Sequence, residues 1–261
     1  MRIVMIGTGN IATVLGKKLK AAGHTIVQVY GRQAENAAAL ATMLNAGACS
    51  DWDALNHDAD LYMVALSDQA VMGLEKHLQL HNRLVVHTAG AVPMQVLRNV
   101  SSSYGVFYPL QTIRKEIEQL PEIPFLLDAN SVSAKEQLQV LARTISGNVS
   151  MAGDEERLKY HLCAVMTNNF SNYLYVQAAG YCEKTGLAFQ QLLPLIDETA
   201  ARLHHATPRS VQTGPAARKD LGTIEKHLGL LKDEPQLTAL YKFFTDQILN
   251  FNWTSNDNHH S

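Results

Sequence analysis

MRIVMIGTGNIATVLGKKLKAAGHTIVQVYGR, residues 1–32, is the stretch from which the architecture of the chain follows. Residues 2–6 form a short run rich in β-branched side chains, the composition of a buried parallel strand. The run ends at a Gly-x-Gly-x-x-Ala turn, Gly7 to Ala12, and apolar residues then recur at helical spacing until Gly23. A second apolar run follows at 26–30. A glycine turn between a strand and a helix, followed by a second strand, is the specific context of a dinucleotide-binding motif.

The small residues of the turn have separate roles. Gly7 permits a tight turn, Gly9 lets the backbone approach a pyrophosphate, and Ala12 allows close packing of the helix on the strand. The free N–H groups and the dipole at the helix N-terminus favour phosphates. We therefore expect the turn to bind a dinucleotide through Gly7, Thr8, Gly9, Asn10 and Ile11.

The end of the second strand indicates which dinucleotide is bound. NAD sites place Asp or Glu about 20 residues after the motif, where it binds the ribose 2′-hydroxyl. Here that region reads Val29-Tyr30-Gly31-Arg32-Gln33 and contains no acid. Arg32 can instead bind a 2′-phosphate through charge-assisted hydrogen bonds, which predicts NADP as the cofactor. The alternative is a solvated arginine that starts the next helix.

Composition argues against several other classes of protein. The 261 residues suit two domains or one large one, and a net charge of −2 leaves no basic footprint for nucleic acid. There is no apolar run near about 18 residues and no signal-peptide pattern, so we expect a cytoplasmic protein without membrane contact. Cys49, Cys163 and Cys182 lack metal-ligand spacing and are expected to be reduced thiols. The polar tail at 255–261 is predicted to be disordered.

Apolar runs and helical patterns alternate up to about residue 152. This alternation of apolar runs and helical patterns is typical of an α/β domain with a doubly wound, mostly parallel sheet. Asp51-Trp52-Asp53 predicts one further helical turn. The predicted strands are 61–66, 84–86, 105–107, 125–127 and 149–150, and the predicted helices are 34–44, 69–80 and 134–144.

Two of these strand ends carry further candidate cofactor contacts. In an open parallel sheet, ligands bind beyond the carboxyl ends of the strands. This places Leu66 and Ser67 beside the ribose of the cofactor, with Asp68 capping the next helix. His87 and Thr88 are placed near the nicotinamide ring. A strand-end histidine that is hydrogen-bonded to a loop explains His87 equally well.

From Glu155 onward no convincing strand pattern remains. We therefore predict an NADP-binding domain at 1–152 and an all-helical domain for substrate binding and dimerisation at 153–254. A helix from Glu155 to about Lys184, with Asp154 as its N-cap, is expected to be the spine of the second domain.

The predicted spine helix carries a polar face. His161, Val165, Asn168 and Asn172 follow one another at spacings of 4, 3 and 4, and Asn169 lies on the flank of this face. Asparagine is a poor residue for the middle of a helix. The cluster therefore requires a partner, which is either a substrate or a neighbouring helix.

A second polar group follows the turn at residues 213–215. Arg218 suits the clamping of a carboxylate or a phosphate, and it suits an inter-helix salt bridge equally well. Asp220 is predicted to cap a helix that runs through Leu231, with His227 on the same face as Asp220.

Together these stretches resemble the Rossmann-like NADP oxidoreductases of the deazaflavin-coenzyme-dependent type that carry an uncharacterised helical C-terminal domain. Wider relatives include the pyrroline-carboxylate reductases and the 6-phosphogluconate and β-hydroxyacid dehydrogenases. The resemblance implies a Rossmann fold, a nicotinamide cofactor and a homodimer formed through the helical domain. The stretches that carry it are Gly7 to Ala12, Leu66-Ser67-Asp68, His87-Thr88-Ala89-Gly90, Tyr108-Pro109-Leu110-Gln111-Thr112, Tyr160-His161 with Asn169, and Thr213-Gly214-Pro215 with Arg218, Asp220 and His227.

Two departures from the family pattern bear on mechanism. The family usually has histidine before Pro-Leu-Gln, where this chain has Tyr108. Relatives with hydroxyacid chemistry use a lysine four residues before an asparagine on the long helix, whereas His161 is followed by Val165 at that spacing. Their mechanism therefore does not carry over to this chain.

The leading hypothesis is an NADP-dependent reductase of a small carbonyl or imine compound that binds in an interdomain cleft. Histidine titrates near neutrality and can act as the general acid. The predicted catalytic residues are His87, His161 and Asn169, and the predicted substrate-binding residues are Tyr108, Asn168, Asn172, Arg218 and His227. The rival hypothesis is a non-enzymatic NADP-binding redox sensor or regulatory protein. A metal-dependent enzyme is disfavoured, because the histidines are not paired with acids at metal-ligand spacing.

Overall fold

The computed structural model describes residues 1–116 and 122–252, and the chain divides into two compact units. The first unit is Met1–Ser171 and the second is Asn172–Ser261. The first half of the predicted spine helix is thus grouped with the first unit. The functional division at residue 152 stays a prediction, and the tail predicted at 255–261 lies outside the described residues.

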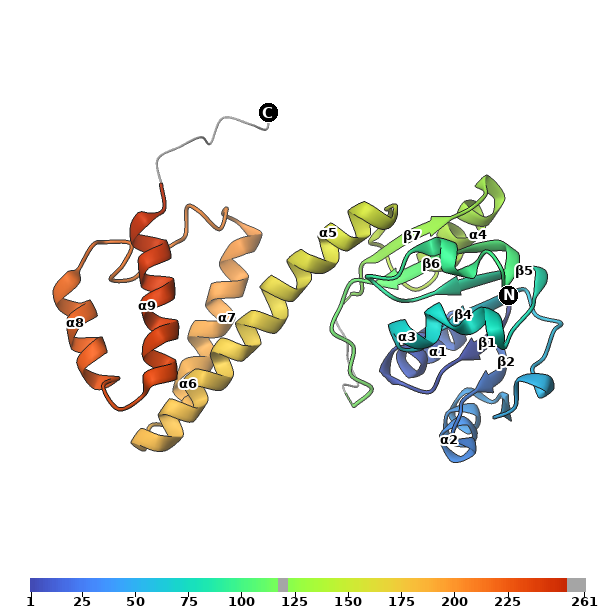
Figure 1. Cartoon of the computed structure of the whole chain (residues 1–261), viewed down its shortest axis with the longest axis horizontal. Coiled ribbons are helices and arrows are strands. Elements are labelled where there is room, and N and C mark those ends of the chain that lie inside the picture. The colour runs from blue at the N-terminus through green and yellow to red at the C-terminus, as the bar shows by residue number, and fades with distance from the viewer. Residues whose placement is uncertain (117–121, 253–261) are drawn as a thin grey trace. The chain divides into compact units, whose positions relative to one another are not determined.

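The first unit contains an eight-stranded sheet in the order β3-β2-β1-β4-β5-β6-β7-β8 (Figure 1). Neighbouring strands are parallel except β6 and β7, which confirms the predicted doubly wound, mostly parallel α/β class. The strands are β1 (Arg2–Ile6), β2 (Thr25–Tyr30), β3 (Gly47–Cys49), β4 (Leu61–Val64), β5 (His81–His87), β6 (Ser101–Pro109), β7 (Phe125–Ala129) and β8 (Val149–Met151). The α-helices of this unit are α1 (Asn10–Ala21), α2 (Ala34–Leu44), α3 (Asp68–Met72), α4 (Val132–Arg143) and α5 (Asp154–Ala164).

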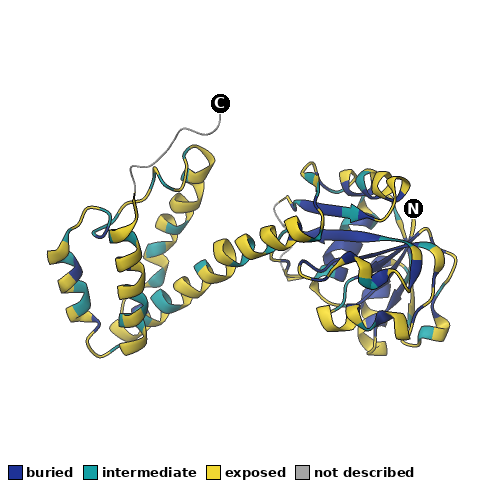
Figure 2. Ribbon diagram, turned by 45° about the horizontal axis from the view of Figure 1, so that its top comes forward, coloured by how far each residue is buried: buried dark blue, intermediate teal, exposed yellow. Residues whose placement is uncertain are grey.

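The sheet is buried on both faces, as the crossover connections of a parallel sheet require. Ile3 and Met5 of β1 belong to an apolar cluster that includes residues of α1, α2 and α4. Val4 and Ile6 point to the other face and pack with residues of α3 and the segments after it. In Figure 2 the central strands are accordingly mostly dark blue, whereas the edge strands β3 and β8 contain no buried residue. This core holds the carboxyl edge of the sheet rigid.

One predicted helix is wrong in length. The pattern at 69–80 predicts a single helix, but Gly73 ends α3 and only a 3₁₀ turn, Leu74–Lys76, follows. The leucines of this stretch are buried against the sheet. Their regular spacing in the sequence therefore comes from an irregular connection that is buried, and not from one face of a continuous helix. Ser67, not Asp68, occupies the N-cap position of α3, and neither side chain caps the helix.

The predicted spine is present, but it is not a uniform α-helix. α5 is followed by a π-helical segment, Val165–Phe170, and then by α6 (Ser171–Thr185). The N-cap of α5 is Gly153, which corrects the assignment of Asp154 to that role. Asp154 instead stands in the first turn, where its carboxylate is free to bind elsewhere.

Helices are the only regular secondary structure among the described residues of the second unit, 172–252. Besides α6 it contains α7 (Leu193–Ala201), α8 (Leu221–Leu230) and α9 (Pro235–Asn250). Asp220 caps α8 as predicted and accepts a hydrogen bond from Thr223 N at 3.1 Å. Few side chains of this unit are buried, and its helices are mostly yellow and teal in Figure 2. The buried residues are Cys182, Ala216, Ile224, Leu231 and Thr245.

Candidate functional site

The glycine turn between β1 and α1 has the geometry that its sequence predicts. Gly7 has a φ of +126°, and a Cβ at this position would lie 2.2 Å from the carbonyl oxygen of Ala65, so only glycine fits. A Cβ on Gly9 would have no atom within 4 Å, so the backbone there is open. No side chain caps the N-terminus of α1, which leaves its first N–H groups for another acceptor. These features fit the pyrophosphate of a dinucleotide.

Arg32 lies beside this turn. A Cβ on Gly31 would lie 2.5 Å from Thr8 Cγ2, so the end of β2 packs directly on the glycine turn. Arg32 follows Gly31, and its side chain is exposed. The backbone of Arg32 therefore lies next to a residue that packs on the turn, and its side chain is not buried in the core.

The ends of β4 and β5 complete this edge of the sheet. Leu66 packs near Gly7, since a Cβ on that glycine would lie 3.4 Å from Leu66 Cδ2. Ser67 is exposed. Thr88 is buried, and its N–H and hydroxyl groups donate to the carbonyl oxygen of Val64 at 3.1 and 3.3 Å. The Thr88 hydroxyl therefore joins the two strand ends.

A pocket of about 360 Å³ lies between the end of β6 and the long helix, and all of its lining residues belong to the first unit. Its walls mix apolar groups with hydroxyl, amide and imidazole groups, and among the described residues none that lines it is Asp, Glu, Lys or Arg. The pocket is lined by Tyr108, Leu110, Gln111 and Thr112 from the strand side and by Tyr160, His161, Cys163, Ala164, Val165, Thr167, Asn168 and Asn169 from the helix.

Tyr108 and His161 meet in the wall of this pocket. The distance from Tyr108 Oη to His161 Nδ1 is 3.0 Å, and the two rings lie edge to face. Gly90 permits this arrangement, because a Cβ there would lie 2.8 Å from His161 Nδ1 and 2.9 Å from Tyr108 Cζ. The backbone after β5 thus packs directly on both rings.

The π-helical segment carries two of the predicted asparagines into the pocket. Asn168 donates a hydrogen bond from its amide to Thr112 Oγ1, and Asn169 lines the pocket beside it. A π turn contains more residues than an α turn, so the helical spacing that puts Asn172 on the His161 face does not continue through this segment. Asn172 belongs to the second unit and is not among the lining residues. Single π turns occur frequently at functional sites.

His87, at the end of β5, is completely buried and does not line the pocket. Its Nδ1 accepts a hydrogen bond from Ala89 N at 3.2 Å. Burial, assisted by the positive charge of Arg157, lowers the pKa of His87 to about 4. The ring is therefore neutral at physiological pH. These contacts favour the second interpretation of His87, a strand-end histidine bound to its own loop.

Arg157 is a central residue that the sequence analysis misses. It is 1% exposed, and its guanidinium donates to the carbonyl oxygens of Gly90 (3.2 Å) and Val92 (2.6 Å). It also pairs with Asp154 at 2.7 Å, and the Asp154 carboxylate accepts a hydrogen bond from Met94 N. The pair therefore clamps the loop after β5 onto α5. The spacing of Asp154 and Arg157, one helical turn, is the signal that the sequence offers.

The remaining predicted substrate residues lie in the second unit. His227 lines an apolar pocket of about 530 Å³, and its Nδ1 is 2.8 Å from the hydroxyl of Tyr241. Arg218 is exposed in the turn before α8. Their predicted contact with substrate stays a prediction.

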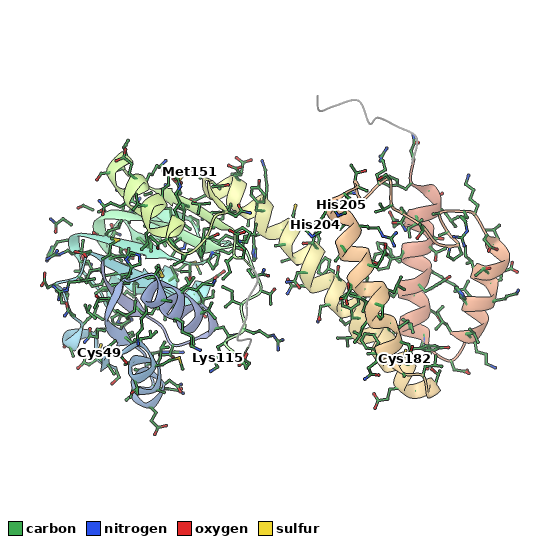
Figure 3. The ribbon with its side chains drawn as sticks, turned by 180° about the vertical axis from the view of Figure 1, so that it is seen from behind. Cys49, Lys115, Met151, Cys182, His204 and His205 are labelled. Carbon is green, nitrogen blue, oxygen red and sulfur yellow. The ribbon has the colours of Figure 1, made fainter. Side chains whose placement is uncertain are left out.

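The described residues contain neither a cluster of potential metal ligands nor a helix that could span a membrane. Within 1–116 and 122–252, no three His, Cys, Asp or Glu side chains form a group suited to a metal ion. The cysteines are free thiols, and Cys49 at the end of β3 and Cys182 on α6 are marked in Figure 3. None of the described helices combines the length and the apolar character that a bilayer-spanning segment needs.

Family models match both parts of the chain. Residues 2–90 match the coenzyme F420-dependent NADP oxidoreductases, and residues 123–248 match a domain of unknown function, DUF2520. A search of the curated proteins gives no match to this sequence.

Solved structures are similar over nearly the whole chain. A Bacteroides fragilis protein assigned as an NADP oxidoreductase is 42% identical, with a TM-score of 0.89 over 96% of this chain and 98% of that one. The 1-pyrroline-5-carboxylate reductase of Streptococcus pyogenes is 16% identical, with a TM-score of 0.68 over 96% and 99%. An imine reductase of Myxococcus stipitatus in complex with NADP⁺ is 14% identical, with a TM-score of 0.65 over 95% and 93%. The last two similarities concern the fold alone.

Proposed function

Because this chain belongs to the NADP oxidoreductase family, we propose that it reduces a small carbonyl or imine compound bound in the pocket between β6 and the long helix. The observation that supports this most is the position of the pocket. Its phenol, imidazole and amide groups are in the same compact unit as the dinucleotide-binding turn. When bound, NADPH supplies the hydride, and the protein supplies orientation and charge stabilisation.

The lining of the pocket supports an uncharged, polar substrate. Small-molecule sites usually have volumes of about 300–1,000 Å³, so this pocket is at the small end of the range. The described residues of its lining include no carboxylate, Lys or Arg, so none of them is a counter-ion for a strongly charged group. Asn168 and Asn169 provide amide groups that hold a carbonyl or imine by hydrogen bonds. We therefore infer that substrate binds between the end of β6 and the first part of the long helix.

The proposal is tested by NADPH oxidation, measured by loss of absorbance, with small ketones, keto acids, cyclic imines and an oxidised deazaflavin as acceptors. We expect turnover with uncharged ketones or imines. Asn169→Leu should abolish this turnover and leave NADPH affinity unchanged, because the leucine removes a pocket amide and alters no residue of the glycine turn. Turnover with the deazaflavin alone would contradict the substrate class proposed here, and turnover with none of the acceptors would contradict the reductase.

Arg32 supports NADPH in preference to NADH. We expect NADPH to bind more tightly than NADH, and Arg32→Ala to remove most of that difference. A lost charged hydrogen bond costs about 1.5–3 kcal/mol, or about ten- to a hundred-fold in affinity. Titration of both cofactors by fluorescence measures this, with NADH affinity as the internal control. Equal affinity of the unmodified protein for the two cofactors would rule out this role of Arg32.

A homodimer formed through the helical domain is part of the proposal. Large apolar side chains of the second unit are exposed, including Leu230 (68%) and Phe243 (57%). Exposed apolar surface of this kind marks an interface, and most homo-oligomers are symmetric.

We expect light scattering at micromolar concentration to give twice 28.8 kDa. The double variant Leu230→Asp, Phe243→Asp should shift the mass toward the monomer, because it buries charge in the interface. The control is Val140→Asp, an equally exposed apolar side chain (67%) on α4 of the first unit, which should leave the dimer intact. A monomer for the unmodified protein would contradict this assembly.

A further inference from the structure

We propose that Tyr108 is the catalytic proton donor of the reduction and that His161 supplies the proton that Tyr108 gives up. The inference rests on the proposed function and assigns a residue role to it. In the sequence prediction, Tyr108 only binds substrate and a histidine is the proton donor. The proposed roles of the two residues differ from that prediction.

The fold holds the Tyr108 hydroxyl and the His161 ring together in the wall of the pocket. Tyr108 is the next-to-last residue of β6, and its ring is only 8% exposed, so the strand fixes its position. Its hydroxyl lies 3.0 Å from His161 Nδ1 and both residues line the pocket. Gly90 packs against both rings and leaves them no room to separate on that side. A phenol and a base held at hydrogen-bond distance in the wall of a pocket are the arrangement that proton transfer to a bound molecule needs.

The Tyr108 phenol is in the protonation state that a proton donor needs. Burial raises the pKa of Tyr108, the nearby Arg157 lowers it, and Asp68 raises it. The net shift is upward, so the hydroxyl keeps its proton at neutral pH and can donate it.

The other acidic groups in or near the pocket are less suitable than Tyr108 as proton donors to a bound substrate. His87 is fully buried outside the pocket lining, and its Nδ1 is occupied by Ala89 N. Tyr160 and Cys163 line the pocket but are exposed to solvent, and the structure gives neither side chain a hydrogen-bonded base. Tyr108 alone among these groups is both held by the core and coupled to an imidazole.

The proton balance of the step is complete. As the substrate carbon receives hydride, the Oη–H bond of Tyr108 breaks and a new bond forms between that proton and the substrate nitrogen or oxygen. The phenolate is stabilised by His161 and takes a proton from Nδ1. A proton from solvent enters at Nε2, because the His161 side chain is only half-buried. The ring is then protonated at Nε2, and exchange of this proton with solvent followed by protonation at Nδ1 returns the donor pair to its starting state.

The test compares three variants in NADPH oxidation with 2-methyl-1-pyrroline, a cyclic imine, and with cyclohexanone. Tyr108→Phe removes only the hydroxyl and should lower kcat about 10²–10⁴-fold, the usual contribution of a general acid. NADPH affinity and thermal stability should be unchanged. His161→Gln should lower kcat less, and its solvent deuterium isotope effect should differ from that of the unmodified enzyme. Tyr104→Phe, a tyrosine on the same strand outside the pocket, is the control and should behave as the unmodified enzyme.

Nitrogen NMR of the His161 ring gives a second readout that does not need turnover. In the unmodified protein the Nδ1 resonance should report a hydrogen bond, and Tyr108→Phe should shift it while Tyr104→Phe should not. Turnover of Tyr108→Phe at the rate of the unmodified enzyme would overturn the donor assignment and leave the reductase standing. No turnover by the unmodified enzyme with any acceptor would overturn both. A Nδ1 resonance that is identical in Tyr108→Phe would overturn the coupling to His161.

Discussion

Arg157→Met is expected to lower the free energy of unfolding by about 2–6 kcal/mol, the cost of leaving two buried backbone acceptors without their donor. The variant keeps the apolar stem of the side chain but leaves the carbonyl oxygens of Gly90 and Val92 without their donor. It also leaves the Asp154 carboxylate without its cation. Each buried acceptor that loses its partner costs about 1–3 kcal/mol by itself.

The matched control for this prediction is Lys159→Met, two residues further along the same helix. Lys159 pairs with Glu155, but both side chains are exposed, at 72% and 84%. A pair of this kind is worth about 0.3–0.5 kcal/mol. Urea unfolding of both variants at one protein concentration makes the comparison. If Arg157→Met and Lys159→Met lose the same stability, the clamp on the loop after β5 does not contribute to stability as inferred.

The two glycines of the cofactor turn are expected to respond to the same substitution in opposite ways. Gly7→Ala should destabilise the fold by about 3 kcal/mol or more. A φ of +126° costs a residue with a Cβ about 1–3 kcal/mol, and the methyl group would also lie 2.2 Å from the backbone oxygen of Ala65, which cannot move as a side chain does. Relief of this contact requires β1 and β4 to separate.

Gly9→Ala should leave stability within about 0.5 kcal/mol of the unmodified protein. The φ of Gly9 is −79°, which alanine adopts readily, and its Cβ would meet no atom within 4 Å. The same methyl group would stand where a pyrophosphate approaches the helix, so NADPH affinity should fall about tenfold or more. Urea unfolding and cofactor titration of both variants separate the two effects. Unchanged NADPH affinity in Gly9→Ala would mean that the pyrophosphate does not approach at this glycine.

The glycine turn could be predicted from the sequence, whereas the contacts of Arg157 and the Tyr108–His161 pair could not. The turn is specified within a dozen residues, because φ preferences, helix starts and the spacing of apolar side chains are local properties of the chain. The same holds for the cap at Asp220 and for the strand that begins at Phe125. Arg157 shows no local signal strong enough to distinguish it from a solvated helix residue, since its partners at Gly90 and Val92 are more than 60 residues away in the chain.

The sequence by itself therefore determined the α/β class of the first unit, most of its strands and helices, the dinucleotide-binding turn and the absence of an acid at the end of β2. Each of these follows from short-range sterics and apolar periodicity. The tertiary structure alone decided that His87 is buried and neutral, and that Tyr108 and His161, 53 residues apart, share one hydrogen bond. It also decided that a π-helical segment carries Asn168 and Asn169 into the pocket. The physical reason is that burial, pKa and side-chain pairing depend on neighbours that folding brings together from distant parts of the chain.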